Sequence, residues 1–256
     1  MSISPINISG QNSKKMAHSI RQNYKNNGTL CDGCVSKHIS LCNVMDQNNL
    51  GILSGISTNL RKKAKQIICS ETDKAEYLYN IRSGAVRISK MLPDGRRQIT
   101  SFLFPGDFFG LSCKDQHSYT AEALTNLEIC RFPRKKIMGL FRDFPELNER
   151  VFDMTRTELD STHARMLLLG RKTATEKLCS FLLNMKAQPS LLNEMANDEV
   201  DLPMSRSDIA DYLGLTVETV SRQFTNLSKL GLIQQGGPHR ISLKNIESLS
   251  VIAAGG

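Results

Sequence analysis

Short apolar runs alternate with turn residues between about residue 50 and residue 135. The runs lie near residues 77–81, 86–88 and 99–104, and Gly, Pro and Asp residues separate them. Runs of this length and spacing are typical of short β-strands. The strongest turn signal is Pro93-Asp94-Gly95, because proline presets one turn dihedral and glycine accepts a positive φ. The pattern predicts an antiparallel β-roll over residues 49–145.

After Pro133 the apolar positions follow a helical period. Residues 146–169 contain neither Gly nor Pro, which favours one long helix over 146–171. A partly apolar stripe with a 3.5-residue spacing runs along it through Leu147, Val151, Met154 or Thr155, Glu158, Ser161, Arg165 and Leu168. The stripe predicts a dimerisation helix with a weak coiled-coil seam, because three of its positions are polar. The alternative is a helix packed along its own β-domain.

The segment from Ser205 to Ile233 carries the most specific pattern. Ser205 and Asp208 have the spacing of a capping box, Gly214 suits the left-handed residue that ends a helix, and Thr216 can cap the next helix. Two short helices joined by a glycine-containing turn describe a helix-turn-helix. An amphipathic helix over residues 172–186 precedes them, and a hairpin wing with His239 and Arg240 at its tip follows.

The outer face of the second helix carries Glu218, Ser221 and Arg222 in its first turns. This part of a recognition helix reaches base edges in the major groove. An arginine can donate two hydrogen bonds to guanine, and a glutamate can accept one from cytosine. A solvated Glu–Arg ion pair is the alternative. The candidate contacts to double-stranded DNA are Glu218, Ser221, Arg222, Thr216, Ser205 and Arg240.

The predicted fold class is therefore α+β, with an N-terminal antiparallel roll, a long dimerisation helix and a C-terminal winged helix-turn-helix over residues 172–256. Residues 1–29 carry four basic and no acidic residues and predict a disordered tail. An organellar transit peptide is the alternative for this tail. No apolar run approaches the roughly 20 residues of a membrane span, so we expect a cytoplasmic protein without a membrane partner.

Charge indicates an anionic partner but does not locate its binding site. The net charge is +8, with +7 in residues 1–70 and −3 in residues 191–256. The basic excess thus lies at the N-terminus, whereas the predicted DNA reader is acidic. Sequence-specific binding by that reader has to depend on a few placed side chains, with cations elsewhere attracting the phosphates.

The seven cysteines do not suggest a disulfide framework, because their number is odd and no secretory signal is present. Cys69 and Cys179 lie in or beside apolar stretches, as does Cys113, and resemble buried core residues. Cys31, Cys34 and Cys42 instead form a C-x2-C-x7-C pattern in the segment 30–48. Thiolates at such spacing can close around zinc or an iron–sulfur cluster, and either centre calls for a fourth ligand.

The order of roll, long helix and winged helix-turn-helix, together with the sequence DIADYLGLTVETVSR, resembles the CRP/FNR family of bacterial transcription regulators over residues 50–246. The E-x-x-S-R face is most similar to the oxygen-responsive FNR branch, including FnrN/FixK-like members. The resemblance implies that Glu218, Ser221 and Arg222 read a TTGAT half-site in an inverted repeat, and that the protein binds it as a homodimer.

The same resemblance implies an oxygen-labile [4Fe-4S] cluster in the segment 30–48. FNR-type sensors hold it with three N-terminal cysteines and one cysteine in the roll. Here the fourth ligand would be Cys130, within TNLEICRFPRKKI, and Cys113 is its rival. The seven residues between Cys34 and Cys42 exceed the best-known FNR spacing and fit FnrN/FixK-like relatives better. A structural zinc site, or a regulator without metal that answers another signal, remains the alternative.

The family's usual cyclic nucleotide is not expected as a ligand here. Leu111 follows Gly110 where a Gly-Glu pair would hold the ribose, and Ser118-Tyr119-Thr120 replaces the Arg-Ser pair that would hold the phosphate. The resemblance further implies a contact with RNA polymerase through a roll loop, for which Asp94, Gly95, Arg96 and Arg97 are the candidates. An exposed turn is the alternative.

Two other classes of function fit the sequence less well. The five histidines are scattered and no nucleophile motif is present, so we expect no enzyme. An iron–sulfur electron carrier would account for the cysteines but would leave the helix-turn-helix without a role.

Overall fold

The computed structural model describes residues 31, 34–112, 114–188, 198–237 and 239–256. The tail expected over residues 1–29 and the rival ligand Cys113 lie outside these residues. Within the described part of the chain, no helix is both long enough and apolar enough to cross a membrane.

Two four-stranded antiparallel sheets form the roll. One sheet has the strand order β1-β8-β3-β6 and the other β2-β7-β4-β5. The strands are β1 (Thr58–Lys62), β2 (Ile67–Cys69), β3 (Tyr77–Ser83), β4 (Val86–Met91), β5 (Arg97–Leu103), β6 (Phe108–Phe109), β7 (Thr120–Ala123) and β8 (Leu127–Pro133). The predicted turn joins β4 to β5, and Gly95 adopts a φ of 85° there, which confirms the glycine requirement.

Strands β3 and β8 are buried on both faces, because side chains alternate along them. Tyr79, Ile81 and Ile129 belong to the apolar interior between the sheets. Leu78, Phe132 and Cys130 belong to a second apolar cluster, shared with the helices outside the roll. Asn80 and Cys130 are direct partners in the β3–β8 pairing. The outer face of this sheet therefore packs against the helices outside the roll.

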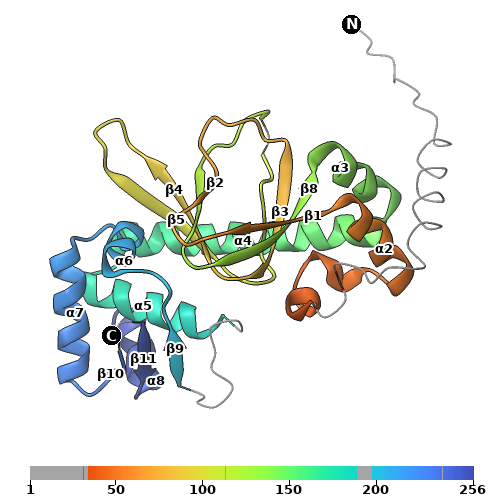
Figure 1. Cartoon of the computed structure of the whole chain (residues 1–256). Coiled ribbons are helices and arrows are strands. Elements are labelled where there is room, and N and C mark those ends of the chain that lie inside the picture. Colours follow the sequence, from red (N-terminus) through yellow and green to blue (C-terminus); the bar gives the residue numbers. More distant parts are fainter. Residues whose placement is uncertain (1–30, 32–33, 113, 189–197, 238) are drawn as a thin grey trace, which may run out of the picture.

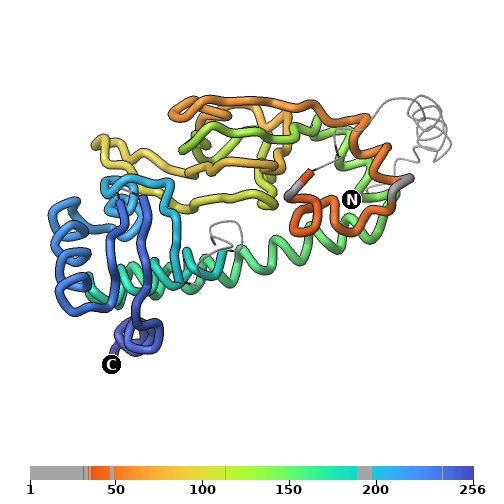
Figure 2. Tube along the Cα trace, turned by 60° about the horizontal axis from the view of Figure 1, so that its bottom comes forward, coloured from red at the N-terminus to blue at the C-terminus, as the bar shows by residue number. Residues whose placement is uncertain are grey.

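The helices lie along the roll and beyond it (Figure 1). They are the 3-10 helices η1 (Val35–His38) and η2 (Leu41–Val44), and the α-helices α2 (Gln47–Ile56), α3 (Arg134–Asp143), α4 (Pro145–Arg171) and α5 (Ala174–Lys186). Helix α4 passes under the roll, with η1 and η2 beside its start and the C-terminal domain at its other end, as Figure 2 shows. The long helix expected from the sequence is thus present and joins the two ends of the molecule.

The apolar positions of α4 are partly buried and partly exposed. Leu147 and Val151 are buried in the cluster with η2 and α3, and Leu168 is buried in the C-terminal domain. Four large apolar residues of α4 are more than half exposed: Phe152, Leu159 and Met166, which are seven positions apart, and Leu167. The apolar ends of the predicted stripe therefore pack within the chain, and the seam towards a second chain stays a prediction.

The C-terminal domain contains α6 (Arg206–Leu213), α7 (Val217–Lys229), α8 (Ile246–Ala254) and a three-stranded sheet ordered β10-β11-β9. Its strands are β9 (Glu199–Asp201), β10 (Ile233–Gln235) and β11 (Arg240–Leu243). Strands β10 and β11 form the predicted wing. With the roll and the long helix, this domain confirms the predicted α+β architecture.

Candidate functional site

The helix-turn-helix is built as its sequence predicts. The Ser205 hydroxyl accepts from the Asp208 N–H at 3.1 Å, and the Asp208 carboxylate accepts from the Ser205 N–H at 3.0 Å, which closes the capping box. Gly214 ends α6 with a φ of 62°. Thr216 then caps α7 by accepting from the Thr219 N–H at 3.2 Å. These local bonds satisfy free backbone groups at the helix ends and fix the angle between the two helices.

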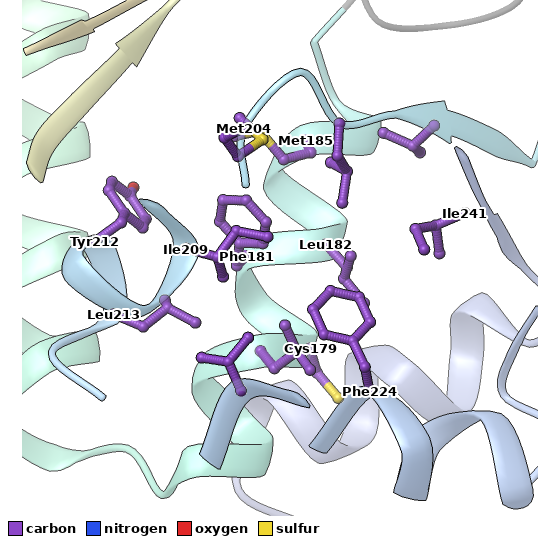
Figure 3. Packing of buried hydrophobic residues seen from close by; sticks show 14 of the residues in the cluster. Cys179, Phe181, Leu182, Met185, Met204, Ile209, Tyr212, Leu213, Phe224 and Ile241 are labelled. Atoms are coloured by element: carbon purple, nitrogen blue, oxygen red, sulfur yellow. The ribbon is translucent and has the colours of Figure 1, made fainter. Parts of the chain in front are cut away.

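A single apolar core holds α6 and α7 against α5 (Figure 3). Phe181 and Leu182 of α5 face Ile209 and Leu213 of α6 and Phe224 of α7, and all five are almost fully buried. Burial of side chains of this size stabilises the domain by roughly 1.5–3 kcal/mol each. Because one face of α7 is committed to this core, its opposite face points outward.

That outward face carries the predicted reading residues. Glu218, Ser221 and Arg222 are all exposed. The pKa of Glu218 is lowered by a backbone N–H at the helix start and by the Thr216 hydroxyl, so its carboxylate stays charged. Within the described part of the chain, Arg222 has no hydrogen-bond or ion-pair partner. A carboxylate and a free guanidinium thus stand side by side on the first turns of α7.

The other candidate DNA contacts are held by the protein itself. Ser205 and Thr216 use their hydroxyls as helix caps. Arg240 lies on β11, where its Nε atom is 3.4 Å from Asp201 and 3.8 Å from Glu199. Acidic neighbours therefore partly neutralise this wing arginine.

Sequence reasoning missed Arg206 at the start of α6. Its guanidinium carbon lies 3.2 Å from the centre of the Phe224 ring, and its Nη2 atom donates to the Gln235 Oε1 atom at 2.8 Å. Burial lowers the pKa of Arg206 to about 10, which leaves the side chain charged at neutral pH. The residue ties α6 to α7 and to the wing. A contact between residues this far apart along the chain leaves no sequence signal.

The second candidate site contains the four predicted cysteines. It lies beside the start of α4, at the end opposite the C-terminal domain. Cys31 and Cys42 are joined by a side-chain hydrogen bond, and the Cys34 N–H donates to the Cys31 carbonyl at 3.3 Å. Cys130 comes from β8 and lies near the first two cysteines of the segment. Cys31, Cys42 and Cys130 share the apolar cluster that contains Leu147 and Val151 of α4. Segments almost 90 residues apart along the chain thus bring their thiols together beside the start of this helix.

The surroundings hold the Cys42 and Cys130 thiols in their neutral form. Burial raises the pKa of Cys130 to about 12, while the guanidinium of Arg82 opposes the shift. The hydrogen bond with Cys31, and then burial, raise the pKa of Cys42 far above its usual range. Since metals and clusters bind the thiolate, a bound centre would have to supply the positive charge that ionises them.

Two polar groups beside the cysteines are buried without a full set of partners. Arg82 is hydrogen-bonded to the Cys34 side chain, but its Nε atom has no acceptor among the described residues. The Oδ1 atom of Asn80, the strand partner of Cys130, is likewise buried without a donor within the described chain. Buried polar atoms of this kind call for a partner.

The four thiols do not form a ready site for a single metal ion. Among the described residues, no three His, Cys, Asp or Glu side chains converge closely enough to hold a single metal ion. In an iron–sulfur cluster each thiolate binds a different iron, so the sulfurs stand further apart than around zinc. Four thiols from two segments beside an arginine are compatible with such a cluster.

Aromatic side chains lie in the roll where the sequence departs from the nucleotide-binding pattern of the family. The Gly110 N–H donates to the Tyr119 hydroxyl at 2.9 Å. Tyr79 and Phe109 stack with their ring centres 4.9 Å apart, and Tyr119 packs against the same apolar cluster. Aromatic side chains fill this part of the roll, while the expectation of no cyclic nucleotide stays a prediction.

The predicted polymerase loop divides into two parts. Asp94 and Arg96 pair with each other at the exposed tip of the β4–β5 hairpin, beside Gly95. Arg97 turns away from the tip and pairs with Asp208 and Asp211 of α6. The sequence placed Arg97 in a loop, whereas the structure places its side chain between the roll and the DNA reader.

A sensor-type roll joined by a long helix to a winged helix-turn-helix defines a class of DNA-binding transcription regulators. A family model of the cyclic nucleotide-binding domain matches residues 60–144, and one of the Crp-like helix-turn-helix domain matches residues 176–252. The chain belongs to the CRP/FNR family of transcription regulators.

The relatives cover nearly the whole chain. The nitrogen fixation regulation protein FixK of Bradyrhizobium diazoefficiens is 36% identical over 88% of this chain and 95% of its own. The transcriptional activator protein FnrL of Cereibacter sphaeroides is 33% identical over 86% of this chain and 90% of its own. The solved structure of FixK2 from Bradyrhizobium japonicum superposes with a TM-score of 0.72 and 38% identity, covering 77% of this chain and 97% of that chain. The protein is accordingly a DNA-binding regulator of the activator type and no enzyme.

Proposed function

We propose that this regulator is controlled by oxygen or a related redox signal through an oxygen-labile [4Fe-4S] cluster, and that Cys31, Cys34, Cys42 and Cys130 hold that cluster. The observation that carries the proposal is the meeting of these four cysteines beside the first turns of α4. When bound, such a cluster supplies an iron–sulfur core that oxygen destroys. The remaining steps depend on residues of the chain.

The cysteine segment contacts the elements that a change in its order would affect. Helix η2 packs on α4, and Arg150 of α4 donates to the Ile39 carbonyl at 2.9 Å. Ile39 itself packs on the backbone of Gly106, where any larger residue would collide with its side chain. Tying the four cysteines together holds these contacts in place, and releasing them leaves the start of α4 with less support.

A change at the start of α4 would act on dimerisation, through the exposed side of this helix. Phe152, Leu159 and Met166 form a heptad-spaced seam that we assign to a second copy of the chain, by analogy with dimers of the family. A seam of three apolar residues gives a marginal dimer. Only a dimer presents two copies of α7 to the two halves of an inverted repeat, which we propose to be of the TTGAT type. The exposed hairpin tip at Asp94 and Arg96 is the proposed contact with RNA polymerase.

Metal analysis of protein prepared without air tests the cluster. We expect a brown protein with about four iron atoms and matching acid-labile sulfide per chain. Cys42→Ala should lose both, whereas the matched control Cys69→Ala, which removes a buried thiol of the roll, should keep them. A colourless or zinc-loaded protein would contradict the proposal and favour a regulator of this family that answers another signal.

A further inference from the structure

The roll and the DNA reader are joined by two ion pairs that share one buried carboxylate. Arg87 of β4 donates to the Asp208 Oδ1 atom at 2.6 Å, and Arg97 of β5 donates to the same oxygen at 2.9 Å. Arg87 also donates to Glu122 of β7 at 2.7 Å, which fixes it to the roll. Asp208 is only 4% exposed. A carboxylate of α6 is therefore held by two arginines from a different domain.

The same carboxylate also begins α6. Its Oδ2 atom accepts from the Ser205 N–H at 3.0 Å and from the Ser205 hydroxyl at 2.7 Å. These hydrogen bonds and the two arginines lower the pKa of Asp208 against the effect of burial. One side chain thus completes the helix cap with one oxygen and anchors the helix to the roll with the other.

A second anchor lies one turn further along α6. Arg97 donates from Nε to the Asp211 Oδ2 atom at 2.8 Å, and Gln98 donates to the Asp211 carbonyl at 2.7 Å. Tyr212 packs on Phe102 of β5, and Arg165 of α4 donates to the Tyr212 hydroxyl at 3.2 Å. Helix α6 is consequently fixed along its length to the β4–β5 hairpin and to α4.

Ion pairs of this kind fix geometry more than they add stability. Removing two charges from water costs about as much as their attraction returns, so an apolar contact would stabilise the interface as well. Directional bonds from an arginine fork, in contrast, define the position and rotation of the helix they hold. Because α7 shares a core with α6, fixing α6 also fixes the exposed face of α7.

We propose that Arg87 and Arg97 of the roll are positioning residues for DNA reading. Through Asp208 and Asp211 they hold the helix-turn-helix at the angle at which α7 meets the major groove. The inference depends on the DNA-binding activity of the family and on no metal centre, so it stands or falls apart from the proposed cluster.

A double-mutant cycle between Arg97 and Asp211 tests the proposal. The probe is a duplex that the wild-type protein selects from a random pool, and affinity is measured by fluorescence anisotropy without air. Arg97→Gln removes the bonds to both Asp208 and Asp211 and should weaken binding by about tenfold, whereas Asp211→Asn removes only one of them and should weaken binding less. The double variant should bind no more weakly than Arg97→Gln alone, because that variant already lacks the Arg97–Asp211 contact. Arg97→Lys should keep part of the affinity.

The sign of the Asp211→Asn effect separates positioning from charge. Losing an acidic group near DNA would by itself strengthen binding, whereas loss of positioning weakens it. Arg96→Gln is the matched control and should leave affinity unchanged, because among the described residues the Arg96 side chain pairs only with Asp94, at the exposed hairpin tip. Gln98→Ala, which alters no charge, should also weaken binding. It replaces Arg97→Gln in the test if that variant does not fold. Unchanged or tighter binding by Asp211→Asn, or additive effects of the two substitutions, would overturn the proposal.

Discussion

At the scale of single residues, we propose that DNA reading depends on a small number of exposed side chains. Arg222 is the strongest of them, because its guanidinium has no partner within the described chain and stands beside Glu218 on the outer face of α7. Neither side chain contributes to the apolar core, so both can be replaced without disturbing the fold.

Arg222→Ala should lower the affinity for the specific site by about 1–3 kcal/mol, the usual value of a bidentate contact with guanine. Affinity for random duplexes should fall much less, and the melting temperature should not change. The comparison is made by titrating specific and random duplexes at one salt concentration. An equal loss on both duplexes would show that Arg222 contacts only phosphates.

Asp107, in the turn between β5 and β6, gives the roll a pH dependence. Burial raises its pKa to about 6, and the charge of Glu158 adds to the shift, although the Phe104 N–H donates to its carboxylate at 2.8 Å. The folded state then favours the protonated carboxyl more than the unfolded state does. The contribution of Asp107 to the free energy of unfolding should therefore rise as the pH falls from about 7 to about 4.

Asp107→Asn keeps an acceptor for the Phe104 N–H and removes the titration. Urea unfolding at several pH values should show a smaller gain in stability on acidification for this variant than for the wild type. Equal slopes in the two proteins would refute the assignment.

The sequence predicts residues well where the signal is local. The capping box, Gly214, Thr216 and the reading face all follow from neighbouring letters, and the structure places each as expected. Arg97 and Arg206 could not be assigned in this way, since their partners lie on other elements. Arg97 and Asp208 are separated by 111 positions, and only the folded chain brings them together.

At the scale of elements, the helix α4 shows what a periodic pattern leaves undetermined. Its existence follows from the absence of Gly and Pro over 24 residues. Which face of α4 is exposed does not follow from the sequence, because the residues that pack within the chain and those that remain exposed are equally apolar. Leu147 and Leu168 are buried at its two ends, while Leu159 is exposed between them.

Leu159→Glu should shift the dimer towards monomer at micromolar concentration, because it places a charge in the middle of the seam. The melting temperature of the monomer should change little, since the residue is more than half exposed there. Thr157→Glu, on the same helix outside the seam, is the control. Analytical ultracentrifugation measures the monomer–dimer equilibrium of the two variants. An unchanged dimer in the Leu159 variant would contradict the assignment of the seam.

At the scale of the whole molecule, the acidic charge of the DNA reader has an intramolecular explanation. Asp208 and Asp211 face the arginines of the roll, and Asp201 and Glu199 face Arg240. Much of the net charge of −3 over residues 191–256 is thus paired within the protein. The overall charge of +8 indicated nucleic acid correctly, but only the structure shows which charges are available to it.

The long helix α4 connects the proposed sensor to the reader. The four cysteines lie beside its first turns, and Leu168 near its end is buried in the core of the reader. We therefore propose that a change in order among the cysteines alters the dimer seam assigned to α4, which lies between them and the DNA-binding domain.

The most direct test of oxygen control measures DNA affinity on one sample before and after exposure to air. Protein prepared without air should bind a TTGAT inverted repeat tightly as a dimer, and should lose that affinity as its iron–sulfur absorbance bleaches. The Cys42→Ala variant should bind weakly under both conditions. Tight binding that air does not alter, in protein shown to lack iron, would contradict oxygen control through the four cysteines.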